Sequence, residues 1–299
     1  MNINIIGVPV NYGCDIDGVQ FGPNELRKLG LVDALSNNGN KVFDFGNIYV
    51  PTYTDESKFK WHDKMKYLNP IVDITRNLAH AVFNSLHSDC FPFVIGGDHS
   101  LGMGSIAGAS KHFKELAVIW VDAHGDINTP DTSPTCNIHG MPLAASMGYG
   151  YNMTTNLYYE GIKVKPRNVY IIGARDLDEG EIKLAEETGL NLYTMEIVRQ
   201  RGLDTILQEV IETIKTSGVD GVHLSYDIDC LDSSLVPGTG TKVDNGFTIG
   251  EGKEILKSLL KTGFVTSMDF VEFNPKIDDE DKSTAKICKD YIYFIGELL

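Results

Sequence analysis

The stretch Leu116-Ala-Val-Ile-Trp-Val-Asp-Ala-His-Gly-Asp-Ile-Asn128 joins a short apolar run to a cluster of acidic and imidazole side chains. Its first half, Leu116–Val121, is apolar throughout, as expected of a strand that helices cover on both faces. Its second half places Asp122, His124 and Asp126 at alternate positions, which an extended strand would present on one face. A buried strand that ends in polar side chains is typical of α/β proteins, whose ligands bind beyond the carboxyl ends of parallel strands.

Similar runs rich in apolar and β-branched residues recur along the whole chain. The predicted strands are Ile3–Val8, Val42–Phe45, Phe91–Ile95, Leu116–Val121, Asn168–Ile172, Leu190–Tyr193, Val222–Tyr226 and Val265–Val271. Amphipathic stretches with helical spacing lie between them, and the acidic run Asp278–Asp281 precedes the last one, as suits a helix N-terminus. This alternation predicts a mainly parallel sheet of about eight strands, either open and doubly wound or closed into a barrel. No linker or repeat interrupts the pattern, so we expect residues 1–299 to form a single domain.

Composition limits the classes of function. The chain of 299 residues has 26 Lys and Arg against 41 Asp and Glu, a formal net charge of −15 at pH 7. An acidic chain is poorly suited to nucleic-acid backbones or anionic membranes, which need a basic face. The five cysteines include no Cys-x-x-Cys pair, so neither a disulfide framework nor a structural zinc site is expected. Without a signal-like start or a membrane-length apolar stretch, the expected location is the cytoplasm.

Three other predicted strands also run into polar clusters. These are Gly96-Gly-Asp-His-Ser100, Asp227-Ile-Asp229 and Glu272-Phe-Asn-Pro275. Carboxylates gathered in one cleft repel one another unless cations neutralise them. Oxygen ligands with a minority of imidazoles suit Mn²⁺ or a similar divalent ion. The four clusters together therefore predict a metal site at the carboxyl edge of the sheet.

In combination, the motifs Gly-Gly-Asp-His-Ser100, Asp-Ala-His-Gly-Asp-Ile-Asn128 and Ser-Tyr-Asp-Ile-Asp229 resemble those of the ureohydrolase family, and within it the arginases. The resemblance extends from Gly18 to Pro275. It implies a three-layer α/β/α fold with an open central sheet, and two Mn²⁺ ions per subunit bridged by hydroxide. It also implies a bacterial-type enzyme that hydrolyses the guanidinium of L-arginine to L-ornithine and urea, and that assembles as a homo-oligomer, a trimer or hexamer.

The family pattern also implies roles for individual residues. One manganese would be held by His99, Asp122, Asp126 and Asp227, and the other by Asp122, His124, Asp227 and Asp229. The implied catalytic residues are Asp126, which fixes the hydroxide, His139, which passes a proton to the leaving amine, and Glu272, which pairs with the guanidinium. The implied substrate contacts are Asn128, Thr135 and Asn137 for the α-carboxylate, and Asp178 and Glu181 for the α-ammonium. Neutral donors for a carboxylate favour arginine over agmatine, which has none.

Some alternatives stay open. Hydrolysis of agmatine or another guanidino compound would make the chain a different ureohydrolase, and loss of catalysis would leave a metal-binding scaffold. Thr135 stands where arginases typically carry Ser, and Cys136 and Cys230 stand where small residues are usual. Because Cys230 follows a ligand motif directly, one hypothesis places its thiol near the metals as a redox-sensitive group. The other interpretation makes Cys230 a small buried hydrophobe. Asp98, Asp232 and the remaining histidines are interpreted as structural.

Overall fold

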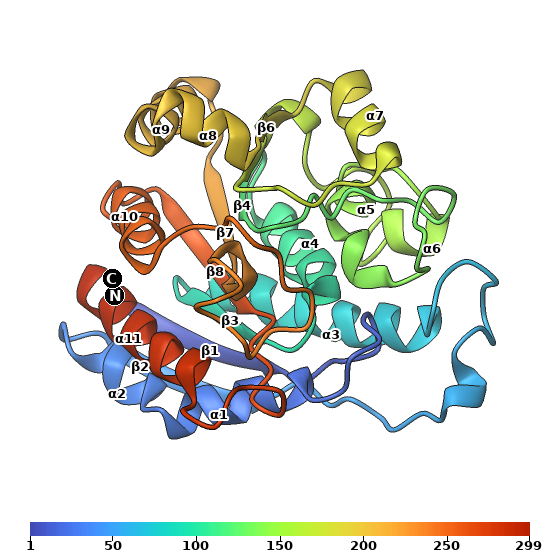
Figure 1. Ribbon diagram of the computed structural model, residues 1–299, viewed down its shortest axis with the longest axis horizontal. Coiled ribbons are helices and arrows are strands. Elements are labelled where there is room, and N and C mark those ends of the chain that lie inside the picture. Colours follow the sequence, from blue (N-terminus) through green and yellow to red (C-terminus); the bar gives the residue numbers. More distant parts are fainter.

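Each predicted strand is present in the computed structural model, which describes all 299 residues, and all eight belong to one sheet. The strands are β1 (Asn2–Val8), β2 (Lys41–Asn47), β3 (Phe91–Gly96), β4 (Leu116–Val121), β5 (Val169–Ile172), β6 (Asn191–Tyr193), β7 (Gly221–Asp227) and β8 (Val265–Val271). Their order is β2-β1-β3-β8-β7-β4-β5-β6, and every pairing is parallel. The sheet is open, with β2 and β6 as its edges, which confirms the open α/β/α fold over the barrel (Figure 1).

Helices cover both faces of this sheet. They are α1 (Gly22–Lys28), α2 (Leu31–Ser36), α3 (Leu68–His87), α4 (Gly102–His112), α5 (Pro142–Ser146), α6 (Asn152–Thr155), α7 (Glu179–Thr188), α8 (Met195–Arg201), α9 (Leu203–Ser217), α10 (Ile249–Leu260) and α11 (Ser283–Leu298). The helices α1, α2 and α8–α11 pack in one buried cluster, and α3, α4, α5 and α7 pack in a second one on the opposite face. A smaller third cluster joins α3, α4 and α5. None of the helices is both long and apolar enough to cross a membrane.

Strand β4 shows how a continuously apolar strand supplies two cores. Ala117, Ile119 and Val121 belong to one cluster, whereas Leu116, Val118 and Trp120 belong to the other. Successive side chains of a strand point to opposite faces, so a strand covered on both sides needs apolar residues at every position. The pattern in the sequence therefore reports burial on both faces.

The acidic run before α11 acts as predicted. Asp278 accepts hydrogen bonds from the backbone N–H groups of Thr284 and Ala285, and Asp279 accepts one from Ser283. These carboxylates satisfy N–H groups that have no partner inside the helix and complement its dipole.

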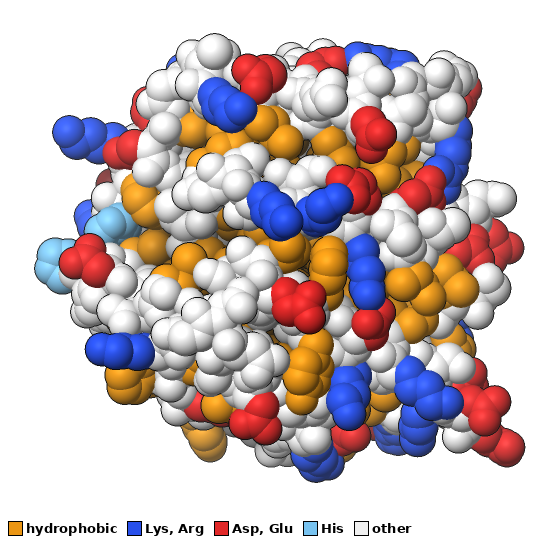
Figure 2. Space-filling model, turned by 90° about the vertical axis from the view of Figure 1, so that its left-hand side faces the viewer, with side chains coloured by type: hydrophobic (Ala, Val, Ile, Leu, Met, Phe, Trp, Pro, Cys, Tyr) orange, Lys and Arg blue, Asp and Glu red, His pale blue; other side chains and the backbone are white.

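Charged side chains are mixed on the surface. On the face drawn in Figure 2, Lys and Arg lie among Asp and Glu, with apolar side chains between them. This face carries no extended basic patch of the kind that phosphate backbones require.

Candidate active site

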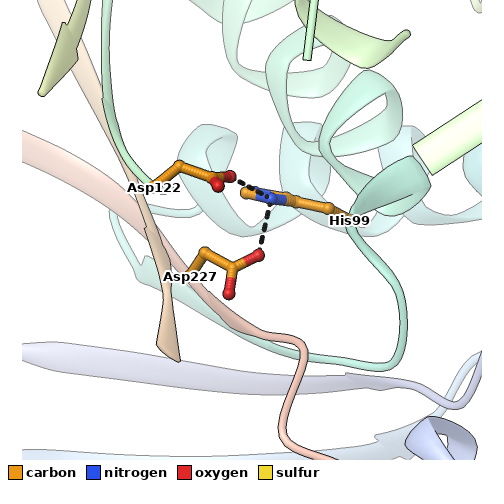
Figure 3. Close-up of side chains that lie close together, drawn as sticks. All are labelled: His99, Asp122 and Asp227. Carbon is orange, nitrogen blue, oxygen red and sulfur yellow. Dashed lines mark ion pairs between the residues drawn. The ribbon is translucent and has the colours of Figure 1, made fainter. Parts of the chain in front are cut away.

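Four neighbouring strands in the middle of the sheet deliver the polar clusters to one place. Adjacent strands follow one another in the order β3, β8, β7 and β4. His99 comes shortly after β3, Glu272 directly after β8 and Asp122 directly after β4, whereas Asp227 is the last residue of β7. Parallel strands end at the same edge, so these side chains converge although up to 173 residues separate them along the chain. Figure 3 shows the imidazole of His99 directed at the carboxylates of Asp122 and Asp227.

The backbone turns directly after β4 and at the end of β7. Asp122 Oδ1 accepts the N–H of His124 at 2.7 Å, and Asp227 Oδ1 accepts the N–H of Asp229 at 2.8 Å. Asp126 has a φ of +54°, in the left-handed region. Aspartate side chains commonly capture the backbone two residues on and so replace extended structure with a turn. The prediction that an extended strand aligns Asp122, His124 and Asp126 was therefore wrong, although the three side chains do converge.

The first convergent group surrounds the His99 ring. Its Nδ1 lies 2.9 Å from Asp122 Oδ2, 3.2 Å from Asp126 Oδ2 and 3.1 Å from Asp227 Oδ2. On the other side of the ring, Nε2 lies 2.8 Å from Ser225 Oγ. In the tautomer that donates Nε2–H to Ser225, the Nδ1 lone pair would face three carboxylate oxygens, an arrangement that a shared cation relieves.

The geometry of these atoms supports that interpretation. His99 Nδ1 and Asp122 Oδ2 are both buried and have no hydrogen bond of acceptable geometry, although they lie 2.9 Å apart. Two atoms that lie close together but are poorly aligned for a mutual hydrogen bond are typical of ligands that both point at a metal ion. The indole ring of Trp120 stacks on the imidazole with 3.9 Å between ring centroids, which holds its plane. The donor set of carboxylates and one imidazole fits a divalent ion.

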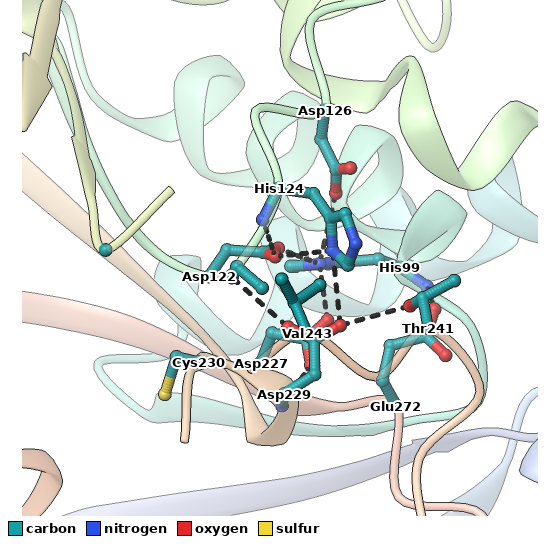
Figure 4. Close-up of polar contacts among 12 residues, drawn as sticks. His99, Asp122, His124, Asp126, Asp227, Asp229, Cys230, Thr241, Val243 and Glu272 are labelled. Atoms are coloured by element: carbon teal, nitrogen blue, oxygen red, sulfur yellow. Dashed lines mark hydrogen bonds and ion pairs between the residues drawn. The ribbon is translucent and has the colours of Figure 1, made fainter. Parts of the chain in front are cut away.

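The second group is formed around His124. Its Nδ1 lies 3.2 Å from Asp122 Oδ1 and 3.2 Å from Asp229 Oδ2. Asp122 thus belongs to both groups, with one carboxylate oxygen in each. Each of the two groups could hold a metal ion. Thr241 donates its hydroxyl to Asp229 Oδ2 at 3.1 Å and orients that carboxylate (Figure 4).

The pKa values of the clustered side chains indicate an excess of negative charge that bound cations would balance. Burial and the neighbouring carboxylates raise the pKa values of Asp126 and Asp227 well above their usual range. Burial lowers the pKa of the His99 imidazole, but the close contact with the Asp122 carboxylate and the attraction to Asp126 outweigh it and raise the pKa to about 9. Carboxyl groups and an imidazole whose pKa values are all raised indicate a site built for cations.

Glu272 and His139 lie next to each other beside this cluster. His139 sits in the 3₁₀ turn Ile138–Gly140, and its Nδ1 lies 3.2 Å from Glu272 Oε1. Glu272 has a φ of +63°, and the same Oε1 accepts the backbone N–H of His99 at 2.8 Å. The left-handed backbone after β8 therefore brings the carboxylate back over the metal-ligand candidates.

A pocket of about 210 Å³ opens onto both groups. None of its lining side chains is hydrophobic. The lining residues are His99, His124, Asp126, Asn128, Ser133, Pro134, Thr135, His139, Gly140, Asp176, Asp178, Glu181, Asp227, Thr241 and Glu272. Six of them are carboxylates and none is Lys or Arg, so the pocket suits a small cationic ligand.

Four of the five predicted substrate-contact residues line this pocket. Asn128 donates to Asp178 Oδ2 at 2.7 Å, which ties one candidate to another. Both oxygens of Glu181 are already engaged, since Oε1 accepts the N–H of Ile127 and Oε2 that of Asp178. Burial raises the pKa of the Glu181 carboxyl to about 7. Glu181 thus closes a capping box at the start of α7 as well as facing the pocket.

Asn137 is placed differently from the other four. It borders a smaller cavity of about 120 Å³ that shares His139, Thr241 and Glu272 with the main pocket. Ser133 and Thr241 line the main pocket although sequence reasoning did not single them out. In the sequence, the only indication of their role is that they lie in loops rich in hydroxyl side chains and glycine.

The residues interpreted as structural have protein partners. Asp98 accepts the backbone N–H groups of Gly13 and Ser100, and Asp232 accepts those of Ser234 and Gly246. Cys230 is fully buried in the apolar core, and its sulfur points away from the carboxylates in Figure 4. The placement of Cys230 therefore favours the interpretation as a small buried hydrophobe.

Comparison with known proteins agrees with the fold and the site. The model of the arginase family matches residues 1–295. The arginase of Bacillus subtilis (strain 168) is 42% identical over 281 residues, 94% of this chain and 93% of that protein. The native structure of arginase from Bacillus caldovelox superposes with a TM-score of 0.91 at 39% identity, covering 99% of this chain and 97% of that one. Arginase from Entamoeba histolytica, solved in complex with L-ornithine, has a TM-score of 0.88 at 31% identity and covers 99% and 97%.

A family match over nearly the whole chain, relatives at about 40% identity and the same parallel sheet lead to one conclusion: the chain belongs to the arginase family.

Proposed function

We propose that this protein hydrolyses the guanidinium group of L-arginine to L-ornithine and urea. The observation that carries the proposal is an acidic pocket, without Lys or Arg, that opens onto two His–carboxylate groups sharing Asp122. The relatives named as arginases, and the one solved with L-ornithine, support this choice of substrate.

Two Mn²⁺ ions are the proposed cofactors. One would be held by His99, Asp122, Asp126 and Asp227, and the other by Asp122, His124, Asp227 and Asp229. When bound, such a pair of ions lowers the pKa of a water molecule and so supplies the nucleophile at neutral pH. Asp126, whose carboxylate faces both His99 and the pocket, is proposed to orient that water and take its proton.

Glu272 is proposed to hold the guanidinium. Its carboxylate is buried, lines the pocket and can accept two parallel N–H groups from a planar guanidinium. Because its backbone is folded back over the metal-ligand candidates, a guanidinium on Glu272 lies beside them.

His139 is proposed to pass a proton to the departing amine. Its ring lines the pocket and contacts Glu272, so it lies next to the group that Glu272 binds. An imidazole titrates near neutral pH and can therefore give up a proton and recover it from solvent.

The far end of the pocket is proposed to recognise the amino-acid head of arginine. Asp178 and Glu181 suit the α-ammonium, and Asn128 and Thr135 offer neutral hydrogen-bond donors to the α-carboxylate. Agmatine would leave those donors unpaired, which makes arginine the favoured substrate. The protein is further proposed to work in the cytoplasm as a homo-oligomer, a trimer or hexamer.

A urea-release assay tests these proposals together. Metal-depleted protein is given L-arginine, agmatine or 4-guanidinobutyrate, each with and without added Mn²⁺. We expect Mn²⁺-dependent urea from arginine above all. Preference for agmatine would contradict the arginase assignment, and no urea from any of the three would leave only the metal-binding scaffold.

A further inference from the structure

Lys66 is a buried lysine that contacts residues 133–137, a segment that lines part of the pocket and is called the substrate loop below. It precedes α3, and its residue is only 8% exposed. Its backbone N–H donates to the carbonyl of Cys136 at 3.0 Å. Its ammonium contacts Asp15 Oδ1 and Oδ2 at 2.9 and 2.7 Å, and Asn137 Oδ1 at 2.8 Å. All three ammonium hydrogens can therefore be used within this contact set.

This arrangement determines which way the Asn137 amide points. Its oxygen accepts from the Lys66 ammonium, and its Nδ2 donates to Asp15 Oδ2 at 3.0 Å. The flipped amide would set its NH₂ group against an ammonium and its oxygen against a carboxylate, so both contacts would become repulsive. Nδ2 carries a second hydrogen, and no protein atom accepts it. Asn137 is thus held as a donor with one hydrogen to spare.

Charge adds to the effect of orientation. The main pocket is lined by six carboxylates and by no Lys or Arg, a surrounding that disfavours an α-carboxylate. Asp15, which contacts Asn137 of the substrate loop, is paired with two lysines, Lys66 and Lys58. This set of three charged side chains therefore carries a net positive charge. Lys58 contacts Asp15 Oδ1 at 2.9 Å and does not contact Asn137. The two lysines therefore share a partner but differ in their contact with the substrate loop.

We propose that Lys66 is a positioning residue that makes the enzyme select substrates with an α-carboxylate. By occupying the oxygen of Asn137, it leaves that amide only as a hydrogen-bond donor, available to the carboxylate directly or through one water molecule. The backbone N–H of Asn137 also donates to Thr135 Oγ1 at 3.2 Å, so the same anchor positions the pocket-lining hydroxyl. This inference rests on the proposed arginine hydrolysis and explains its discrimination against agmatine.

The test compares Lys66→Met with the wild type on two substrates. With L-arginine, KM should rise about tenfold, the effect of one hydrogen bond, while kcat stays within about twofold. With agmatine, measured as a substrate or as a competitive inhibitor, the affinity should not change, because it has no carboxylate. Lys66→Gln keeps a hydrogen-bond donor without the charge, so its KM for arginine should lie between those of the wild type and Lys66→Met. If the Met variant does not fold, the KM of the Gln variant is the measurement that tests the proposal.

Lys58→Met is the matched control. It removes the other lysine from Asp15 but leaves the contact between Lys66 and Asn137, so KM for arginine should rise less than twofold. An equal rise in both variants would show that net charge, and not the orientation of the amide, sets the affinity. That result would overturn the proposal.

A double-mutant cycle provides the second measurement. If Lys66 acts through Asn137, adding Lys66→Met to Asn137→Ala should cause no further rise in KM for arginine. Additive effects, or equal losses of affinity for arginine and agmatine, would contradict the positioning role and leave Lys66 as a structural residue. Absence of urea release by the wild type would instead refute the proposed function itself, so the two failures can be told apart.

Discussion

The imidazole of His139 lies 3.2 Å from the carboxylate of Glu272, and both line the pocket. Burial lowers the pKa of His139, but hydrogen bonding and attraction to Glu272 outweigh it, and the pKa is raised above the usual imidazole value. The protonated form of His139 therefore persists to higher pH than that of a free imidazole.

This pairing leads to a prediction about pH. His139→Asn should lower kcat for arginine by about 10²- to 10⁴-fold, since a general acid is lost, while bound Mn²⁺ stays the same. Only protonated His139 can give a proton, so its advantage should be greatest at low pH and fall as the pH rises through its raised pKa. The ratio of wild-type to variant kcat between pH 6 and 10 is the measurement. A ratio that does not vary with pH would contradict the role of His139 as a proton donor.

The shared position of Asp122 leads to a prediction about metal content. Asp122→Asn should lose Mn²⁺ and urea release together, because one carboxylate oxygen lies in each candidate group. Asp232→Asn is the control, since Asp232 follows the neighbouring strand β7 but accepts hydrogen bonds from Ser234 and Gly246. Metal analysis after dialysis should find Mn²⁺ in the control variant only. A metal-loaded Asp122→Asn protein would contradict the bridging assignment.

The strands and the site motifs could be predicted because their signals are local. A strand buried on both faces needs apolar side chains at every position, so Leu116–Val121 was predicted with the bounds it has in the structure. The acids and histidines follow directly on those strands. The clustering of the four strand ends also needed only one assumption, that the sheet is parallel.

The strand order and the contacts between distant loops could not be predicted in the same way. No local pattern states that β8 lies between β3 and β7, although this places Glu272 beside His99. The turns at Asp122 and Asp227 arise when a carboxylate captures a backbone N–H, which competes with extended structure at the same sequence. Lys66 and Arg175 act mainly through partners far away in the chain, which no local pattern identifies.

Arg175 illustrates the last case and gives a prediction about stability. Its guanidinium donates to six backbone carbonyls, three of which belong to the consecutive residues Asp229, Cys230 and Leu231. Two others, on Val243 and Asp244, belong to the loop that carries Thr241. The planar fork thus ties the Asp229 loop to the loop that orients its carboxylate.

We expect Arg175→Lys to lower the free energy of unfolding by about 2–4 kcal/mol, because an ammonium cannot replace five N–H donors and leaves buried carbonyls unpaired. Its affinity for Mn²⁺ should fall as well. The control is Arg76→Lys, at a surface arginine paired with Asp73, which should change stability by less than about 0.5 kcal/mol. Urea unfolding and Mn²⁺ titration measure both effects. Equal stability of the two variants would show that the carbonyl contacts of Arg175 do not hold the loops together.

Cys230 gives the final prediction, because its sequence position next to Asp229 suggested a reactive thiol. The side chain is fully buried, and burial raises the pKa of the thiol well above its ordinary value. Peroxide reacts with the exposed thiolate, so a buried, protonated thiol is protected. Cys230→Ala should therefore leave the loss of activity in peroxide unchanged, and should lower the free energy of unfolding by about 1 kcal/mol through the small cavity that it creates. Residual urea release after timed exposure to hydrogen peroxide is the measurement. If the Ala variant resisted peroxide while the wild type did not, Cys230 would have to reach solvent through an opening motion near the Asp229 loop.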